Sequence, residues 1–134
     1  MEKKIQIYTD GSARGNPGPA GYGIVFHIGS KTIEHGGRVD HATNNMMELT
    51  GPIEAMKYLK KLESKGFAQG NPVQKVEIIS DSKYVILGIT EWIDNWIKNG
   101  WRNAAKKPVL NKELWQELYE LNQEFLSLIH ISEP

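Results

Sequence analysis

The chain has 134 residues, and its 16 lysine and arginine residues balance 16 aspartate and glutamate residues, so the formal net charge is zero. This balance excludes a protein whose whole surface is basic and binds nucleic acid, but it does not exclude a local basic patch. The absence of cysteine excludes disulfides, thiolate zinc sites and cysteine nucleophiles. The length fits one domain, and no apolar stretch approaches the ~20 residues of a membrane span or resembles a signal core. We therefore expect a single-domain cytoplasmic protein with no membrane segment.

Three runs of alternating apolar and polar residues near the start of the chain predict strands: residues 5–9, 22–28 and 32–39. A loop rich in glycine and proline (15–21) and a short turn (29–31) connect these runs. Such short connections predict an antiparallel meander. We expect the first strand to end at Asp10, because Asp-Gly is typical of turns.

From Thr43 the apolar residues recur with a helical period, and the predicted buried stripe is Leu49, Ile53, Met56, Leu59 and Leu62. Pro52 lies inside this helix and cannot donate to the carbonyl of Glu48, so we expect a local kink there. Residues 64–72 have the composition of a surface loop.

A buried strand is predicted at 76–80, ending just before Asp81, and a helix at 84–99, with a break at Gly88 as an alternative. After a polar loop at 100–110, a last helix at 111–125 has a predicted buried stripe of Leu114, Leu118, Leu121 and Phe125. This order of strands and helices predicts an α/β or α+β fold with helices packed on a mixed sheet.

Three carboxylates stand out by their positions. Asp10 and Asp81 each follow an apolar strand directly, and parallel neighbouring strands would bring both to one sheet edge. Glu48, early in the following helix, can reach the same edge. Such a set of oxygen ligands favours Mg²⁺ or Mn²⁺ over zinc. Plainer interpretations are a turn at Asp10, a helix cap at Asp81-Ser82, and a capping box that pairs Asn45 with Glu48.

Four segments resemble bacterial type-one ribonuclease H: TDGSARGNPGPAGYG (9–23), TNNMMEL (43–49), SDSKYV (80–85) and WIDNWIKNGWRNAAKKPVLN (92–111). They occur in the family's order, with compatible spacing, from residue 5 to about residue 125. The resemblance implies a ribonuclease H-like mixed sheet, with a three-strand antiparallel meander plus parallel strands, flanked by helices.

The resemblance also implies endonucleolytic hydrolysis of the RNA strand of RNA/DNA hybrids, leaving 5′-phosphate and 3′-hydroxyl ends, by a monomeric enzyme. It implies two Mg²⁺ ions per site, which Mn²⁺ can replace. Asp10 is then expected to bridge both ions, and Glu48 and Asp81 to complete the ligand shell of one.

Substrate contacts follow from the same resemblance. Asn16, Asn44 and Asn45 match contacts to the minor groove, and Ser12 and Lys83 match residues near the RNA backbone. Thr43 and Asn111 match a pocket for a DNA-strand phosphate. His41 stands where the family often has arginine, which predicts a weaker and more pH-dependent grip on the DNA strand.

Residues 92–112, which we call the handle, carry five cations against Asp94 alone, a net charge of +4. A basic segment interleaved with aromatic residues predicts contact with phosphates. The cations expected to bind substrate are Lys98, Arg102, Lys106 and Lys107. Tyr84, Trp92 and Trp96 match a channel for the DNA strand with some packing role, whereas Trp101 is expected to pack.

Two features depart from the family pattern. The family has a later Gly-His loop and a fourth carboxylate, but no aspartate follows Asp94, and His130 has no such loop around it. Residues 126–134, LSLIHISEP, resemble the translation of a transposase adapter used in DNA sequencing. We therefore expect residues 1–125 to be an incomplete ribonuclease H-like domain and 126–134 a non-native tail; a short natural strand is the alternative.

The missing carboxylate leaves a second function open, that of a catalytically impaired module that binds RNA/DNA hybrids. A third is a different nuclease on the same fold, such as a transposase core or an exonuclease. The basic handle and the TNN triplet argue against this third function.

Overall fold

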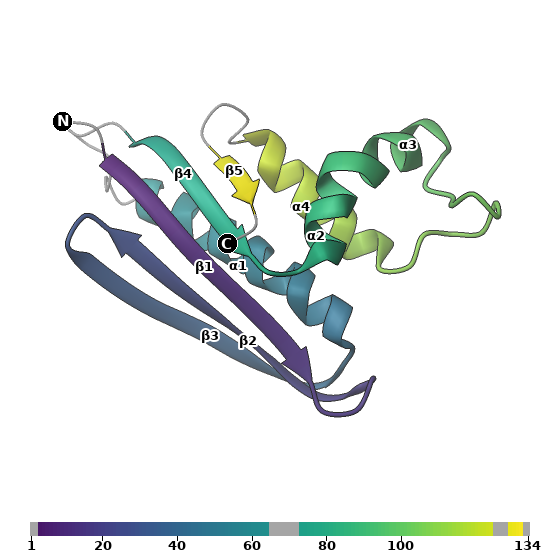
Figure 1. The fold of residues 1–134 in the computed structure, drawn as a ribbon, viewed down its shortest axis with the longest axis horizontal. Helices are drawn as coiled ribbons and strands as arrows, with labels where there is room; N and C mark the ends of the chain where they lie inside the picture. Colours follow the sequence, from purple (N-terminus) through teal and green to yellow (C-terminus); the bar gives the residue numbers. More distant parts are fainter. Residues whose placement is uncertain (1–2, 65–72, 125–128, 133–134) are drawn as a thin grey trace.

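The structure is a computed structural model that describes residues 3–64, 73–124 and 129–132. Five strands form one sheet in the order β3-β2-β1-β4-β5 (Figure 1). The strands are β1 (Lys3–Ala13), β2 (Gly18–Ile28), β3 (Lys31–Ala42), β4 (Val73–Ser80) and β5 (Ile129–Ser132). The helical elements are α1 (Asn44–Ser64), α2 (Lys83–Leu87), the π-helical turn η1 (Gly88–Trp92), α3 (Ile93–Lys98) and α4 (Lys112–Glu124).

The predicted meander is confirmed, since β1 pairs antiparallel with β2, and β2 with β3. The predicted end of the first strand is wrong, because β1 continues through Asp10 to Ala13, which pairs with Ala20 of β2. The parallel pairing of β1 with β4 stops at Thr9 and Ser80. Asp10, still within β1, and Asp81, the first residue after β4, are therefore the next residues of the chain beyond the parallel ladder.

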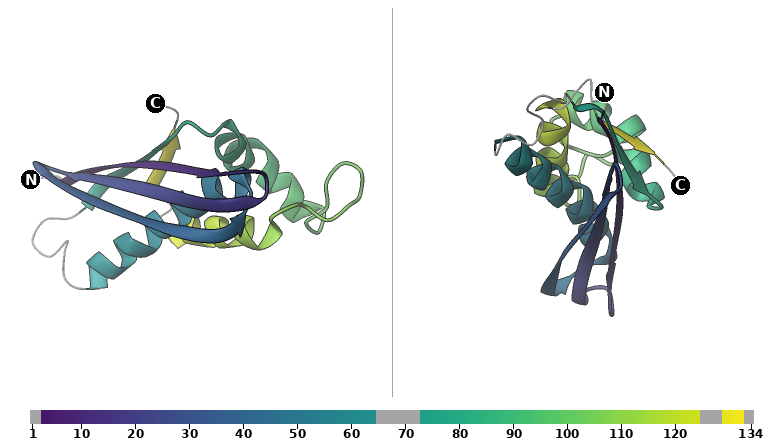
Figure 2. Two further views of the ribbon diagram at one scale, coloured as in Figure 1. Left: turned by 90° about the horizontal axis from the view of Figure 1, so that it is seen from below. Right: turned by 90° about the vertical axis from the view of Figure 1, so that its left-hand side faces the viewer.

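The core lies between the sheet and α1, and α1 and α4 lie together on one side of the sheet (Figure 2). The strands contribute alternate buried residues such as Ile7 and Phe26. The predicted stripe of α1 is confirmed at its first four positions, Leu49, Ile53, Met56 and Leu59, whereas the side chain of Leu62 is outside the described part. Full burial of each such side chain contributes roughly 1.5–3 kcal/mol. The helix runs through Pro52 without interruption.

An ion pair joins the two helices that cover the sheet. The Lys57 Nζ of α1 lies 2.5 Å from Glu117 Oε1 of α4 and 3.5 Å from Glu54 Oε1. The hydrogen bond to Glu117 is the main cause that raises the pKa of Lys57 above its ordinary value, against a smaller opposing effect of burial. Because both partners are substantially exposed, the pair adds only modestly to stability.

The helical stretch after β4 does not end at Gly88. The backbone stays helical there and widens into the turn η1, which continues into α3. A Cβ at Gly88 would lie 1.9 Å from Cη2 of Trp115, so only glycine permits this contact. In α4, Leu118 and Leu121 are buried as predicted and Leu114 is partly buried, but the fully buried Trp115 was not predicted, and Phe125 is outside the described residues.

β3 is one edge strand of the sheet, and at the opposite edge β5 pairs in parallel with β4. The β pattern that we noted in residues 126–134 is thus confirmed for Ile129–Ser132, whereas the non-native origin of this segment stays a prediction. The predicted loop at 64–72 lies almost entirely outside the described residues. No helix within residues 3–64 and 73–124 has the length and apolar character needed to cross a membrane.

Candidate active site

Three acidic residues belong to the segments that meet where the β1–β4 ladder ends. Asp10 and Asp81 are both exposed at this edge, and the half-buried Glu48 lies in the second turn of α1. Gly11 allows α1 to approach β1, because a Cβ at this position would lie 2.4 Å from the carbonyl oxygen of Met47. This backbone contact places residue 48 beside the strand position that follows Asp10.

Ser82 connects Glu48 with the start of α2. Its hydroxyl donates to Oε2 of Glu48 at 2.7 Å and accepts from the backbone N–H of Val85 at 3.2 Å. The side chain of Ser82 is buried and Glu48 is half-buried, so this bond is partly shielded from water. The helix cap that we considered at Asp81-Ser82 is confirmed for Ser82. The contact with Glu48 was not predicted, since the two residues lie 34 positions apart.

The capping box considered for Glu48 is wrong. Thr43 caps α1 instead, because its Oγ1 accepts from the backbone N–H of Met46 at 3.1 Å. Glu48 lies one turn further along, with its carboxylate bonded to Ser82. This leaves Glu48 without a role in starting its own helix and favours a role at the sheet edge.

The chemistry of this donor set fits a divalent cation of the Mg²⁺ type, which prefers carboxylate oxygens. In the present arrangement Oδ1 of Asp10 accepts from the N–H of Gly11 at 2.9 Å, and Glu48 is bonded to Ser82. Among residues 3–64, 73–124 and 129–132, no three acidic or histidine side chains lie close enough to hold a metal as they stand. Ligation by Asp10, Glu48 and Asp81 stays a prediction that needs side-chain rotation.

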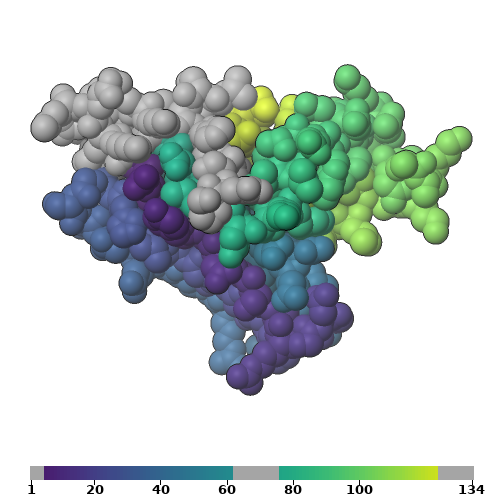
Figure 3. All heavy atoms as spheres, viewed as in Figure 1, coloured from purple at the N-terminus to yellow at the C-terminus, as the bar shows by residue number. Residues whose placement is uncertain are grey.

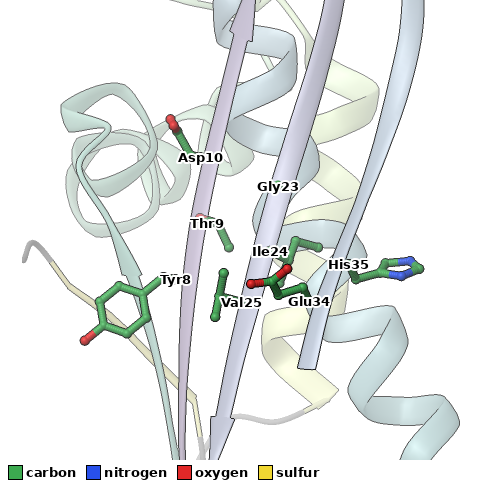
Figure 4. Close-up of a pocket in the computed structure, with 8 residues that line it drawn as sticks. All are labelled: Tyr8, Thr9, Asp10, Gly23, Ile24, Val25, Glu34 and His35. Atoms are coloured by element: carbon green, nitrogen blue, oxygen red, sulfur yellow. The ribbon is translucent and has the colours of Figure 1, made fainter. Parts of the chain in front are cut away.

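The surface beside Asp10 is open. A hollow of about 320 Å³ adjoins it, and its lining residues include Tyr8, Val25 and Glu34. In Figure 4, Asp10 and Tyr8 project from the same side of β1 toward this surface. Gly23 pairs with Asp10 across the β1–β2 ladder and has no side chain to cover it. A bulky substrate can therefore reach the carboxylate of Asp10.

Two of the predicted minor-groove asparagines form one network. Oδ1 of Asn16 accepts from the backbone N–H of Asn44 at 3.0 Å, and Oδ1 of Asn44 accepts from the N–H of Ala13 at 2.7 Å. These bonds tie the β1–β2 connection to the first residue of α1. With both carbonyl oxygens fixed, the two amide NH₂ groups are oriented as donors. Asn45 and Ser12 are exposed nearby in the chain, and Lys83 is exposed at the first turn of α2.

The predicted aromatic channel is a packed cluster at one end of the helical layer. Tyr84 and Trp92 lie with ring centroids 6.1 Å apart, and Trp92 and Trp96 5.9 Å apart. Trp96 also contacts Trp101, as predicted for a packing role, and the buried Trp115. The three predicted channel residues are all partly buried, which leaves part of each side chain accessible.

Asn111 is bonded to this cluster. Its Nδ2 donates to the hydroxyl of Tyr84 at 3.2 Å, beside the bond from Nε1 of Trp115 at 3.0 Å. In the described part of the chain no hydrogen bond joins Asn111 to Thr43, so their shared phosphate pocket stays a prediction. His41 is exposed near the end of β3.

The tip of the handle is a short, internally bonded loop that projects from the body of the protein (Figure 2). Nη1 of Arg102 donates to the carbonyl of Lys106 at 3.1 Å, and Oδ1 of Asn103 accepts from the backbone N–H groups of Ala105 and Lys107. The four predicted substrate-binding cations are all exposed: Lys98, Arg102, Lys106 and Lys107. The loop therefore presents its charges to solvent on a fixed backbone.

Comparison with known proteins gives a consistent result. A family model described as RNase H matches residues 2–132. Over 126 residues the chain is 45% identical to Ribonuclease H of Thermosynechococcus vestitus, covering 93% of this chain and 74% of that protein. It is 46% identical over 121 residues to Ribonuclease H of Nitrosomonas eutropha, covering 90% and 72%.

Solved structures agree with these sequence matches. LC11-RNase H1, in a crystal structure with RNA/DNA hybrid, superposes with a TM-score of 0.72 at 27% identity, covering 97% of this chain and 84% of that chain. The N-terminal RNase H domain of a Mycobacterium tuberculosis protein gives a TM-score of 0.71 at 29% identity, with coverages of 98% and 86%.

Proposed function

The chain belongs to the RNase H family, and from this premise we propose that it hydrolyses the RNA strand of RNA/DNA hybrids endonucleolytically, giving 5′-phosphate and 3′-hydroxyl ends. The observation that carries the proposal is the end of the parallel β1–β4 ladder, where Asp10 and Asp81 follow the last paired residues and α1 brings Glu48 to the same edge. The similarity to LC11-RNase H1, which was solved with a hybrid, supports the substrate.

Asp10, Glu48 and Asp81 are the residues that would hold Mg²⁺, or Mn²⁺ in its place. Two such ions, when bound, supply charge stabilisation for phosphoryl transfer and a more acidic water. The protein contributes the backbone positions from which the carboxylates would turn toward the ions: the strand sets the backbone of Asp10, and the hydroxyl of Ser82 holds one oxygen of Glu48 near the start of α2. Asn16 and Asn44 present amide donors beside this edge, where they can contact base edges and the 2′-hydroxyl groups that distinguish RNA from DNA.

The DNA strand of the hybrid is held on the other side of the site. The exposed parts of Tyr84, Trp92 and Trp96 offer apolar surface for sugars, and the handle cations offer contacts to phosphates. Thr43 lies at the N-terminus of α1, where the positive end of the helix dipole favours a phosphate. Because all these residues come from one chain, we propose that the protein acts as a monomer, in the cytoplasm.

A cleavage assay tests this function. A labelled RNA/DNA hybrid is incubated with the protein in Mg²⁺ and separately in Mn²⁺, with duplex DNA and duplex RNA as substrate controls. Cleavage of the hybrid alone, lost in Asp10→Asn, is the expected result. Salt-sensitive binding of the hybrid without cleavage would replace the proposal by the hybrid-binding module. Cleavage of duplex DNA would replace it by a different nuclease on this fold.

A further inference from the structure

Two arginines near the active site have no role in the function described so far. Arg14 follows the end of β1 and Arg38 lies in β3, and both are exposed. Within residues 3–64, 73–124 and 129–132, neither makes an ion pair with an acidic side chain. Arginine suits bidentate contact with phosphate, so these two guanidinium groups are candidates for such a contact.

The strand register places Arg38, and the turn after β1 places Arg14, beside one hollow. Ser12, Gly21 and Arg38 pair directly across β1, β2 and β3, so they point to the same face of the sheet. Gly21, in the middle, has no side chain and leaves a gap. The hollow has a volume of about 500 Å³, and its lining is Ser12, Arg14, Pro19, Ala20, Gly21 and Arg38.

The hollow is continuous with the active site. Asp10 and Gly23 form the neighbouring row of the same face, two residues along the strands, which corresponds to about 7 Å. Because Gly21 and Gly23 both lack side chains, the floor between Asp10 and the arginines is bare backbone. The acidic residues nearest along these strands are Asp10 itself and Asp40, which lies two positions after Arg38 in β3 and does not line the hollow.

We propose that Arg14 and Arg38 bind a backbone phosphate of the RNA strand adjacent to the one at Asp10; this inference rests on the function proposed above. The substrate is then held from two sides. In Figure 3 the purple β1–β2 end and the yellow-green handle project separately, with a recess between them. The handle holds the DNA strand, and the two arginines fix the RNA strand so that its next phosphate meets Asp10.

Binding of a hybrid by the Asp10→Asn variant, followed by fluorescence anisotropy from about 50 to about 400 mM salt, tests this inference. Adding both Arg14→Gln and Arg38→Gln should make the plot of log binding constant against log salt concentration less steep by about one unit of slope. The same double change should weaken binding about 5- to 10-fold at about 100 mM salt. The matched control is Lys31→Gln, which removes an exposed cation at the opposite end of the β2–β3 hairpin and should change neither quantity.

Neutral methylphosphonates at single positions of the RNA strand then locate the contact. A methylphosphonate at one position near the cleavage site should weaken binding when both arginines are present. The same methylphosphonate should have no effect when both arginines are replaced, since the contact is then already lost. Thermal melts of the double variant should match the Lys31→Gln control, which excludes a folding defect.

The outcomes separate this inference from the proposed function. An unchanged salt slope, or no position that couples to the arginines, shows that they are only solvated charges and overturns the inference while hybrid cleavage by the wild type stands. Absence of both hybrid binding and hybrid cleavage overturns the proposed function and this inference together.

Discussion

A methyl group at Gly11 is expected to damage both the fold and the active site. The Cβ of Gly11→Ala would lie 2.4 Å from the carbonyl oxygen and 2.5 Å from the carbonyl carbon of Met47. These are backbone atoms of the first helical turns of α1, so no side-chain rotation can relieve the clash. Either β1 or the start of α1 has to move by about 1 Å to restore ordinary contact.

The size of the effect follows from this displacement. Overpacking at a rigid contact costs about 2–3 kcal/mol of unfolding free energy. For a chain of this length that corresponds to a melting temperature lower by roughly 8–12 °C. Because the same movement shifts Glu48 relative to Asp10, we also expect cleavage to slow by roughly 10- to 100-fold at temperatures where the variant is folded.

Thermal melts, with Gly23→Ala as the matched glycine control for stability, and single-turnover cleavage by Gly11→Ala measure the two effects. A Cβ at Gly23 meets no atom within 4 Å, so this variant should melt within a few degrees of the wild type. If Gly11→Ala melts at the temperature of the control and cleaves at the wild-type rate, the close approach of α1 to β1 does not position Glu48.

Ser82→Ala removes the cap of α2 and the donor to Glu48, so we expect a loss of about 1 kcal/mol in unfolding free energy and roughly 10-fold slower cleavage. Ser82→Thr keeps the hydroxyl and should recover most of the stability and of the cleavage rate. Slow cleavage by Ser82→Thr would contradict the role of the hydroxyl. The raised pKa of Lys57 means that its pair with Glu117 stabilises the fold below the ordinary lysine pKa of 10.5 and loses this effect as pH rises through the folded-state value. Melts from about pH 9 to pH 12 should therefore show an alkaline decline that is smaller in Glu117→Gln, by under about 1 kcal/mol. Arg102→Gln should weaken binding of hybrid and of duplex DNA alike, and should make the slope of log binding constant against log salt concentration less steep by about one. A loss of affinity confined to one nucleotide sequence would contradict contact with phosphates.

Local periodicity predicted most of the architecture. The meander, the buried stripe of α1 and the strand before Asp81 depend on residues close in sequence, and the structure confirms them. The end of β1 could not be predicted in this way. Asp10-Gly11 is typical of a turn, but pairing of Ala13 with Ala20 of β2 extends the strand through it, and such pairing is a tertiary effect.

The contacts that were missed join residues far apart in the chain. Trp115 is adjacent to the leucine stripe of α4, and its complete burial depends on the missing side chain at Gly88. Ser82 has the sequence of a helix cap, yet nothing nearby in the sequence indicates that its hydroxyl proton is donated to Glu48. The candidate carboxylates themselves were predictable, because two of them sit next to apolar strand runs.

The central claim is that Asp10 and Asp81 act as parts of one cleaving centre at the end of the β1–β4 ladder. Single-turnover cleavage of an RNA/DNA hybrid by Asp10→Asn, Asp81→Asn and the double variant tests it most directly. Residues that act as a unit have non-additive effects, so we predict that each single variant loses nearly all activity and that the double variant is no worse. Losses that multiply in the double variant, or a near wild-type rate in either single variant, would contradict the claim.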